Sequence, residues 1–127
     1  MRSLLTSLAA VLAAFALVAL PAATAATAGR ATVSRLEVTE KEYSLTLSRL
    51  RVHGGKVIVQ VLNFGMDNHD LVIKANAKSG KTWSFAVLSP GSHATKTMTL
   101  PAGKYTLSCS LPGHRQLGMV ATLTVTG

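Results

Sequence analysis

The chain has 127 residues, a formal net charge of +8 at pH 7 and one cysteine. This length allows one small domain behind a targeting segment and excludes a second independent core. The basic residues occur singly and without interleaved aromatic side chains. This pattern argues against nucleic acid as a partner and indicates a basic surface that attracts acidic molecules.

Residues 1–28 have the pattern of a secretory signal sequence. Arg2 gives a positive start, an almost unbroken run of Leu, Ala and Val covers 4–20, and small residues follow. Cleavage after residue 25 or 28 would leave one domain at 29–127, which we expect to be exported to the periplasm, the cell envelope or the medium. An uncleaved segment would instead keep the protein at a membrane, because the apolar run is only slightly short for a span.

The rest of the chain alternates apolar and polar residues at the spacing of short β-strands. Gly and Pro residues separate these segments, and no helical periodicity occurs beyond the signal sequence. We therefore expect an all-β domain, an antiparallel Greek-key sandwich or barrel of about eight strands. The expected strands cover 31–38, 43–47, 49–53 (an extension of the second or a short edge), 56–62, 69–74, 82–88, 93–100, 104–109 and 119–126.

Four potential metal ligands are present, three at the ends of these strands and one, His114, in the loop between the last two strands. Cys109, His114 and Met119 follow the order C-x4-H-x4-M around a loop whose Gly and Pro residues let the chain reverse. His69 is the leading candidate for a fourth ligand, because it shares a face with the core residues of its strand. A thiolate and two imidazoles bind copper strongly, and a weak axial thioether lets the geometry change little on reduction. We therefore predict a copper site.

Other interpretations of the same residues stay open at this point. A lone buried cysteine is often an apolar filler, and Met119 taken alone would be a core residue. A nucleophilic Cys109 with a histidine base would indicate an enzyme, but Met119 would then have no role. Zinc is disfavoured because thioether is a poor zinc ligand. His53 and His93, beside turn and polar residues, are expected at the surface.

Two segments carry a likeness to a known family: NFGMDNHDLV at 63–72 and GKYTLSCSLPGHRQLGM at 103–119. They resemble the cupredoxins, the small blue copper proteins, with a loop spacing similar to that of the rusticyanin or sulfocyanin type. The resemblance implies a β-sandwich that holds one copper ion, with three equatorial ligands and one axial ligand. The equatorial ligands would be His69, Cys109 and His114, and the axial ligand Met119.

The resemblance also implies a function and one point of departure. It indicates a carrier of single electrons, not an enzyme, that exchanges electrons through the exposed edge of His114. Asp70 stands where many relatives have asparagine, so the resemblance does not fix the hydrogen bonding behind His69, nor the redox potential.

The leading hypothesis is an exported electron carrier that cycles between Cu(II) and Cu(I). The alternative is an extracytoplasmic protein of copper storage or delivery that uses the same ligands. We expect a monomer whose redox partner, an acidic one given the net charge, docks near His114. Leu111, Pro112 and Leu117 would form an apolar docking patch there, unless they belong to the core.

Overall fold

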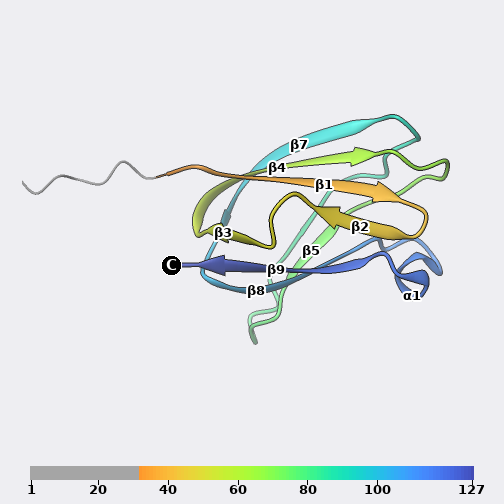
Figure 1. Cartoon of the computed structure of the whole chain (residues 1–127). Coiled ribbons are helices and arrows are strands. Elements are labelled where there is room, and N and C mark those ends of the chain that lie inside the picture. The colour runs from red at the N-terminus through yellow and green to blue at the C-terminus, as the bar shows by residue number, and fades with distance from the viewer. Residues whose placement is uncertain (1–31) are drawn as a thin grey trace, which may run out of the picture.

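The computed structural model describes residues 32–127, so the signal sequence predicted at 1–28 lies outside the described part of the chain. Figure 1 shows the elements in chain order. They are β1 (Ser34–Lys41), β2 (Ser44–Leu47), β3 (Arg51–His53), β4 (Gly55–Asn63), β5 (Val72–Ala75), β6 (Thr82–Ser84), β7 (His93–Leu100), β8 (Gly103–Ser108), α1 (His114–Leu117) and β9 (Val120–Thr126). β7 has the expected bounds, whereas β1 is displaced toward the C-terminus from the expected 31–38.

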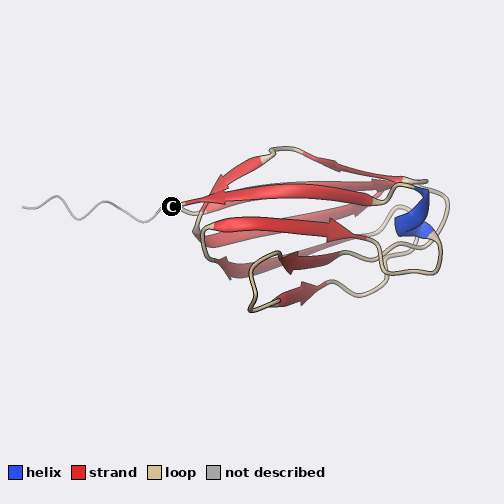
Figure 2. Cartoon of the chain, turned by 90° about the horizontal axis from the view of Figure 1, so that it is seen from below, coloured by secondary structure: helices blue, strands red, loops and turns tan. Residues whose placement is uncertain are grey.

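Two mixed sheets form the sandwich that Figures 1 and 2 show from two sides. One sheet has the strand order β2-β1-β4-β7 and the other the order β3-β9-β8-β5-β6. The sandwich confirms the expected fold class, but β1 pairs in parallel with β4, and β3 pairs in parallel with β9. The chain crosses to the second sheet through β3 before it returns as β4. Because no hairpin joins β1 to β4, the two strands are free to run in the same direction.

Alternating apolar side chains fill the space between the two sheets. On β4, Val57, Val59 and Val61 are fully buried, and β-branched residues suit such a pleated inward face. On β8, Tyr105 and Leu107 are buried in the same alternating way. Full burial of an aliphatic side chain contributes about 1.5–3 kcal/mol relative to leaving it exposed. The core therefore rests on the period-two pattern visible in the sequence.

The strands near the expected first histidine ligand are shorter than predicted. β5 begins at Val72 instead of residue 69, and β6 ends at Ser84 instead of residue 88. Between them, His69 and Leu88 form an isolated antiparallel bridge. The amide of His69 donates to the carbonyl of Leu88 at 3.1 Å, and the reverse bond measures 2.7 Å. His69 is therefore fixed by backbone hydrogen bonds although it lies outside a regular strand.

One end of the sandwich carries the loop between β8 and β9, where α1 replaces the plain turn that was expected. A helix of this length is too short to show a helical periodicity of apolar residues, so the sequence pattern could not predict it. Figure 2 shows α1 at this end and the C-terminus at the opposite end. Within residues 32–127, no helix has the length and apolar character needed to cross a membrane.

Candidate metal centre

Three of the predicted ligands come together at the end of the sandwich that carries α1. Their ligand atoms, one each from His69, Cys109 and His114, all lie within 4.8 Å of one another. Nδ1 of His69 lies 3.1 Å from Nδ1 of His114, which in turn lies 3.6 Å from Sγ of Cys109. His53 and His93 are exposed, as expected. Two imidazole nitrogens and one thiol sulfur in this arrangement suit a soft or borderline metal ion such as copper.

Met119, the predicted fourth ligand, is fully buried immediately before β9. Its amide donates to the carbonyl of His114 at 3.0 Å, and its carbonyl accepts from the amide of Cys109 at 3.2 Å. These bonds close the loop, so the backbone holds all three residues of the C-x4-H-x4-M pattern together. The role of the Met119 sulfur as a ligand stays a prediction.

Two glycines allow the loop to take this shape. Gly113 precedes α1 with a φ of 82°, and Gly118 follows it with a φ of 126°, values that residues with a Cβ disfavour. A Cβ on Gly118 would also lie 2.7 Å from the backbone oxygen of Tyr43. The Tyr43 ring packs edge-on against the ring of His114, with 5.1 Å between the centroids. The reversal that the sequence indicated is therefore confirmed, and it depends on close approach to the β1–β2 connection.

His114 is the ligand candidate that reaches the surface. His69 and Cys109 are fully buried, whereas His114 is half-buried. Leu117, at the end of α1, is 61% exposed and therefore belongs to the surface instead of the core. The ring of His114 thus offers a contact between the buried ligand cluster and a molecule outside.

Asp70 links the segment of His69 to the loop that follows Cys109. Its Oδ1 accepts a hydrogen bond from the amide of Ser110 at 2.6 Å, and its Oδ2 accepts one from the Ser110 hydroxyl. Asp70 therefore holds the segment after Cys109, and its carboxylate bonds Ser110 instead of the ring of His69. Burial raises the pKa of the Cys109 thiol. A metal ion must therefore displace the thiol proton when it binds.

Glu42, which the sequence did not single out, contacts the outer side of His69. Its Oε1 lies 2.9 Å from Nε2 of His69 and accepts hydrogen bonds from the amides of Met66 and Asp67, both at 2.8 Å. The Asp67 amide is the largest of the contacts that lower the pKa of Glu42 to about 2, in spite of desolvation. No spacing motif links Glu42 to a histidine 27 positions later, so only the fold reveals this contact.

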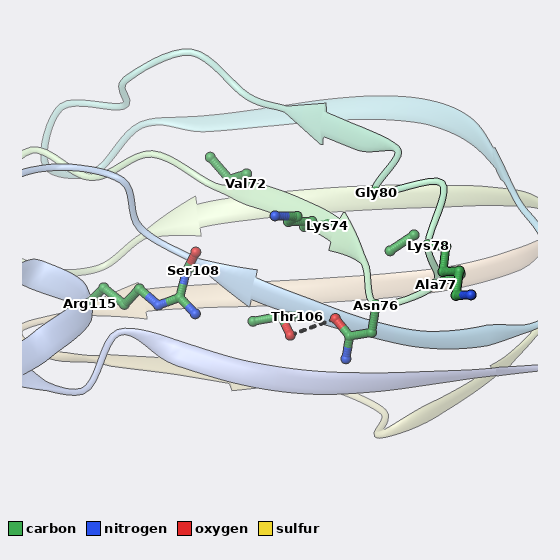
Figure 3. A pocket seen from close by; sticks show the side chains of 10 residues that line it. Val72, Lys74, Asn76, Ala77, Lys78, Gly80, Thr106, Ser108 and Arg115 are labelled. Atoms are coloured by element: carbon green, nitrogen blue, oxygen red, sulfur yellow. Dashed lines mark hydrogen bonds between the residues drawn. The ribbon is translucent and has the colours of Figure 1, made fainter.

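A groove of about 540 Å³ is lined by residues of β5 and β8 and extends to Arg115 of α1 (Figure 3). Lys74, Lys78 and Arg115 line it, and we call it the cationic groove. None of the five acidic residues of the chain lies in its lining. Because Arg115 directly follows His114, the positive charge of the groove begins beside the ligand that reaches the surface.

Comparison with known families points to the same chemistry as the geometry. A family model described as copper binding proteins, plastocyanin/azurin family, matches residues 32–126. No curated protein sequence matches the chain. The matched range contains all four predicted ligands.

Solved structures share the fold at low sequence identity. Reduced auracyanin from Roseiflexus castenholzii is 20% identical with a TM-score of 0.59, and the match covers 78% of this chain and 100% of that chain. Rusticyanin from Thiobacillus ferrooxidans is 18% identical with a TM-score of 0.60, covering 74% and 77%. The Cu-containing nitrite reductase from Thermus scotoductus is 15% identical with a TM-score of 0.53, covering 73% and 31%. These likenesses show a common architecture.

Proposed function

This chain belongs to the plastocyanin/azurin family of copper-binding proteins, the cupredoxins, and we propose that it is an exported type 1 copper protein that carries single electrons. His69, Cys109 and His114 would hold the copper ion, and Met119 would serve as a weak fourth ligand. When bound, copper supplies a one-electron Cu(II)/Cu(I) couple. The observation that carries the proposal is the convergence of two imidazole nitrogens and one sulfur within 4.8 Å.

The surroundings of the ligands favour electron transfer over copper storage or delivery. Backbone hydrogen bonds join His69 to Leu88, and join both Cys109 and His114 to Met119. Ligands held in this way suit a redox couple whose geometry must change little between oxidation states. Release of copper to an acceptor would require the hydrogen-bonded loop to open. Redox cycling without loss of copper therefore supports the carrier, and rapid transfer to a chelator would favour delivery.

The state of Cys109 supports a carrier instead of an enzyme. The thiol is fully buried, and burial raises its pKa. A nucleophilic cysteine needs the opposite conditions, an accessible sulfur with a lowered pKa. A similar fold occurs in the nitrite reductase, but this chain covers only 31% of that chain, and the likeness there supports the architecture alone.

We place the docking surface for a redox partner where His114 reaches the surface. The ring of Tyr43, 37% exposed, packs against the imidazole, and Leu117, 61% exposed, lies at the other end of the short helix that begins with His114. Both offer apolar contact to a partner. The cationic groove begins at Arg115 and continues to Lys74. A partner that carries acidic side chains near its own redox centre fits this arrangement, because complementary charge speeds and orients the encounter.

The copper site is tested by titrating the mature, reduced protein with Cu(II) while visible absorption and electron paramagnetic resonance are recorded. We expect an intense thiolate-to-copper band and narrow hyperfine splitting, both absent from Cys109→Ser. His53→Ala is the matched control, because His53 pairs with Thr126 at the opposite end of the sandwich and should leave both signals intact. A colourless product, or an ordinary tetragonal copper spectrum, would contradict the proposal.

The docking surface is tested with hexacyanoferrate(II), a small anionic reductant, as the probe. Lys74→Glu reverses a charge in the cationic groove and should slow reduction of the copper protein roughly tenfold at low salt, with the effect fading as salt increases. Lys56→Glu makes the same charge change on an exposed position of β4 outside the groove and should slow reduction much less. Equal slowing by both variants would show that net charge alone matters and that the groove is not the docking surface.

A further inference from the structure

Glu42 lies in the connection between β1 and β2 and reaches the side of the His69 ring that faces away from the other ligand candidates. We propose that Glu42 positions His69 for copper, by holding its Nε2 protonated and its Nδ1 free, and that its negative charge lowers the reduction potential of the site. The statement about the potential rests on the proposed function. The proton on Nε2 of His69 is expected in the metal-free protein as well.

The hydrogen-bond partners of Glu42 decide which ring nitrogen of His69 carries the proton. Oε1 of an ionised carboxylate only accepts hydrogen bonds, and here it already accepts from the amides of Met66 and Asp67. At 2.9 Å from the same oxygen, Nε2 of His69 must therefore be a donor. A neutral imidazole then has its lone pair at Nδ1, the nitrogen that faces His114. Histidines that bind metals are generally oriented by a partner of this kind.

A second set of contacts fixes Glu42 itself. Asn63 is fully buried, and its amide side chain donates to the carbonyls of Asp67 at 2.8 Å and Leu88 at 2.9 Å, while it accepts from the amide of Gly65 at 2.9 Å. These bonds shape the turn whose amides hold the Glu42 carboxylate. A Cβ on Gly65 would overlap that carboxylate, so the turn closes on Glu42 only because residue 65 has no side chain.

The charge of Glu42 acts on a buried ligand. The His69 side chain is fully buried, and the Glu42 side chain is 24% exposed, so the pair is only partly screened by water. Among residues 32–127, this is the only pair in which a carboxylate oxygen lies within ion-pair distance of a basic side-chain nitrogen. A negative charge behind a ligand strengthens nitrogen donation and favours the more positive metal state, Cu(II), over Cu(I). The reduction potential should therefore be lower than that of the same site without the charge.

The test of the potential uses a substitution that removes the charge but keeps a hydrogen-bond acceptor. Glu42→Gln should raise the reduction potential enough to shift the Cu(I)/Cu(II) ratio at a fixed solution potential at least tenfold, which equals about 59 mV for one electron. Glu37→Gln removes the same charge from an exposed position on β1 and should leave the potential nearly unchanged. Spectroelectrochemistry of the copper-loaded wild type and of the two variants measures the shift in reduction potential that each substitution causes.

The test of positioning uses nuclear magnetic resonance of the metal-free protein, labelled with nitrogen-15 at histidine. In the wild type and in Glu42→Gln, we expect a downfield, slowly exchanging proton on Nε2 of His69. In Glu42→Ala this proton has lost its acceptor and should exchange with water at least tenfold faster. The backbone spectra of the same samples show whether each variant is folded, and Glu42→Gln decides the potential even where Glu42→Ala does not fold.

The outcomes separate this inference from the proposed function. An unchanged potential in a blue Glu42→Gln protein would overturn the electrostatic role. A proton on Nδ1 of His69 in the wild type, or equal exchange from Nε2 in the wild type and a folded Glu42→Ala, would overturn the positioning role. A wild-type protein that forms no blue site would overturn the proposed function and the statement about its potential, while the proton measurement still decides whether Glu42 orients His69.

Discussion

Glu40 and Glu42 lie two residues apart, at the end of β1 and in the connection that follows it, yet their surroundings are opposite. Glu40 is fully buried, and neither of its carboxyl oxygens has a hydrogen-bond partner among the described residues. Burial, with the negative charge of Asp70 as a second cause, raises its pKa to about 7. Hydrogen bonds lower the pKa of Glu42 to about 2, the Asp67 amide first among them. The contrast shows that a carboxylate at this end of the sandwich is stabilised in its ionised form only where backbone amides or other groups donate hydrogen bonds to it.

The largest effect on stability is expected from Glu40→Gln, which replaces the buried carboxyl group that lacks hydrogen-bond donors. A folded-state pKa of about 7, above the ordinary value of 4.5, means that Glu40 favours the folded state at low pH and that this stability is lost as pH rises toward and through 7. A shift of this size corresponds to about 3 kcal/mol. Glu40→Gln does not titrate, so its stability relative to the wild type should increase by about that amount between pH 4 and pH 8.

Urea denaturation of the metal-free proteins across this pH range measures the difference. Glu37→Gln, an exposed change on the same strand, should show almost no such dependence. A difference between Glu40→Gln and the wild type that stays constant with pH would mean that Glu40 has donors in solution and that the contrast with Glu42 does not hold.

The next effect concerns copper affinity, which should depend on Glu42 but not on Glu40. Glu42→Ala removes the partner of a ligand histidine and should weaken copper binding about 10–100-fold. Glu40→Gln should bind copper nearly as the wild type does, because Glu40 makes no hydrogen bond to a ligand within residues 32–127. Competition with a chelator of known affinity gives both values. Equal losses in the two variants would remove any special role of Glu42.

A smaller effect is expected at Gly65, which lies against the Glu42 carboxylate. Gly65→Ala should destabilise the metal-free protein by about 1–3 kcal/mol, because the added methyl group overlaps the Glu42 carboxylate. In a Glu42→Ala background the same substitution should cost much less, since the overlapping group is gone. Urea denaturation of the wild type, the two single variants and the double variant forms a double-mutant cycle that measures the interaction energy between residues 42 and 65. Additive costs would show that residue 65 is restricted for another reason.

The smallest effect tests Asp70, which is buried like Glu40 but has donors like Glu42. Ser110→Ala removes the hydroxyl donor to Oδ2 and leaves the amide donor to Oδ1 in place. One hydrogen bond should be lost, at a cost of about 1 kcal/mol in urea denaturation. If Ser110→Ala lowered the free energy of unfolding more than Gly65→Ala does, the Ser110 hydroxyl would contribute more to stability than the close fit of the turn around Glu42.

Most of the ligand set could be predicted because its information is local. Strand alternation places Cys109 on an inward face, and the short spacing to His114 leaves the loop few ways to return. Glu40 also continues the inward alternation of Leu36 and Val38, so its burial could have been read from the pattern. Glu42 could not have been found in this way, because its contact joins the β1–β2 connection to the segment between β4 and β5, which only the fold of the whole chain brings together. The parallel pairing of β1 with β4 has the same non-local origin.

The C-terminus lies at the end of the sandwich opposite α1, as Figure 2 shows. β4 alone, from Gly55 to Asn63, spans about 30 Å at the usual rise per residue. A molecule bonded to an electrode through Gly127 would therefore hold its His114 face toward the solution and far from the metal surface. In that orientation dissolved reagents would reach the site freely while direct current to the electrode would be slow, and attachment near Leu117 would reverse both properties.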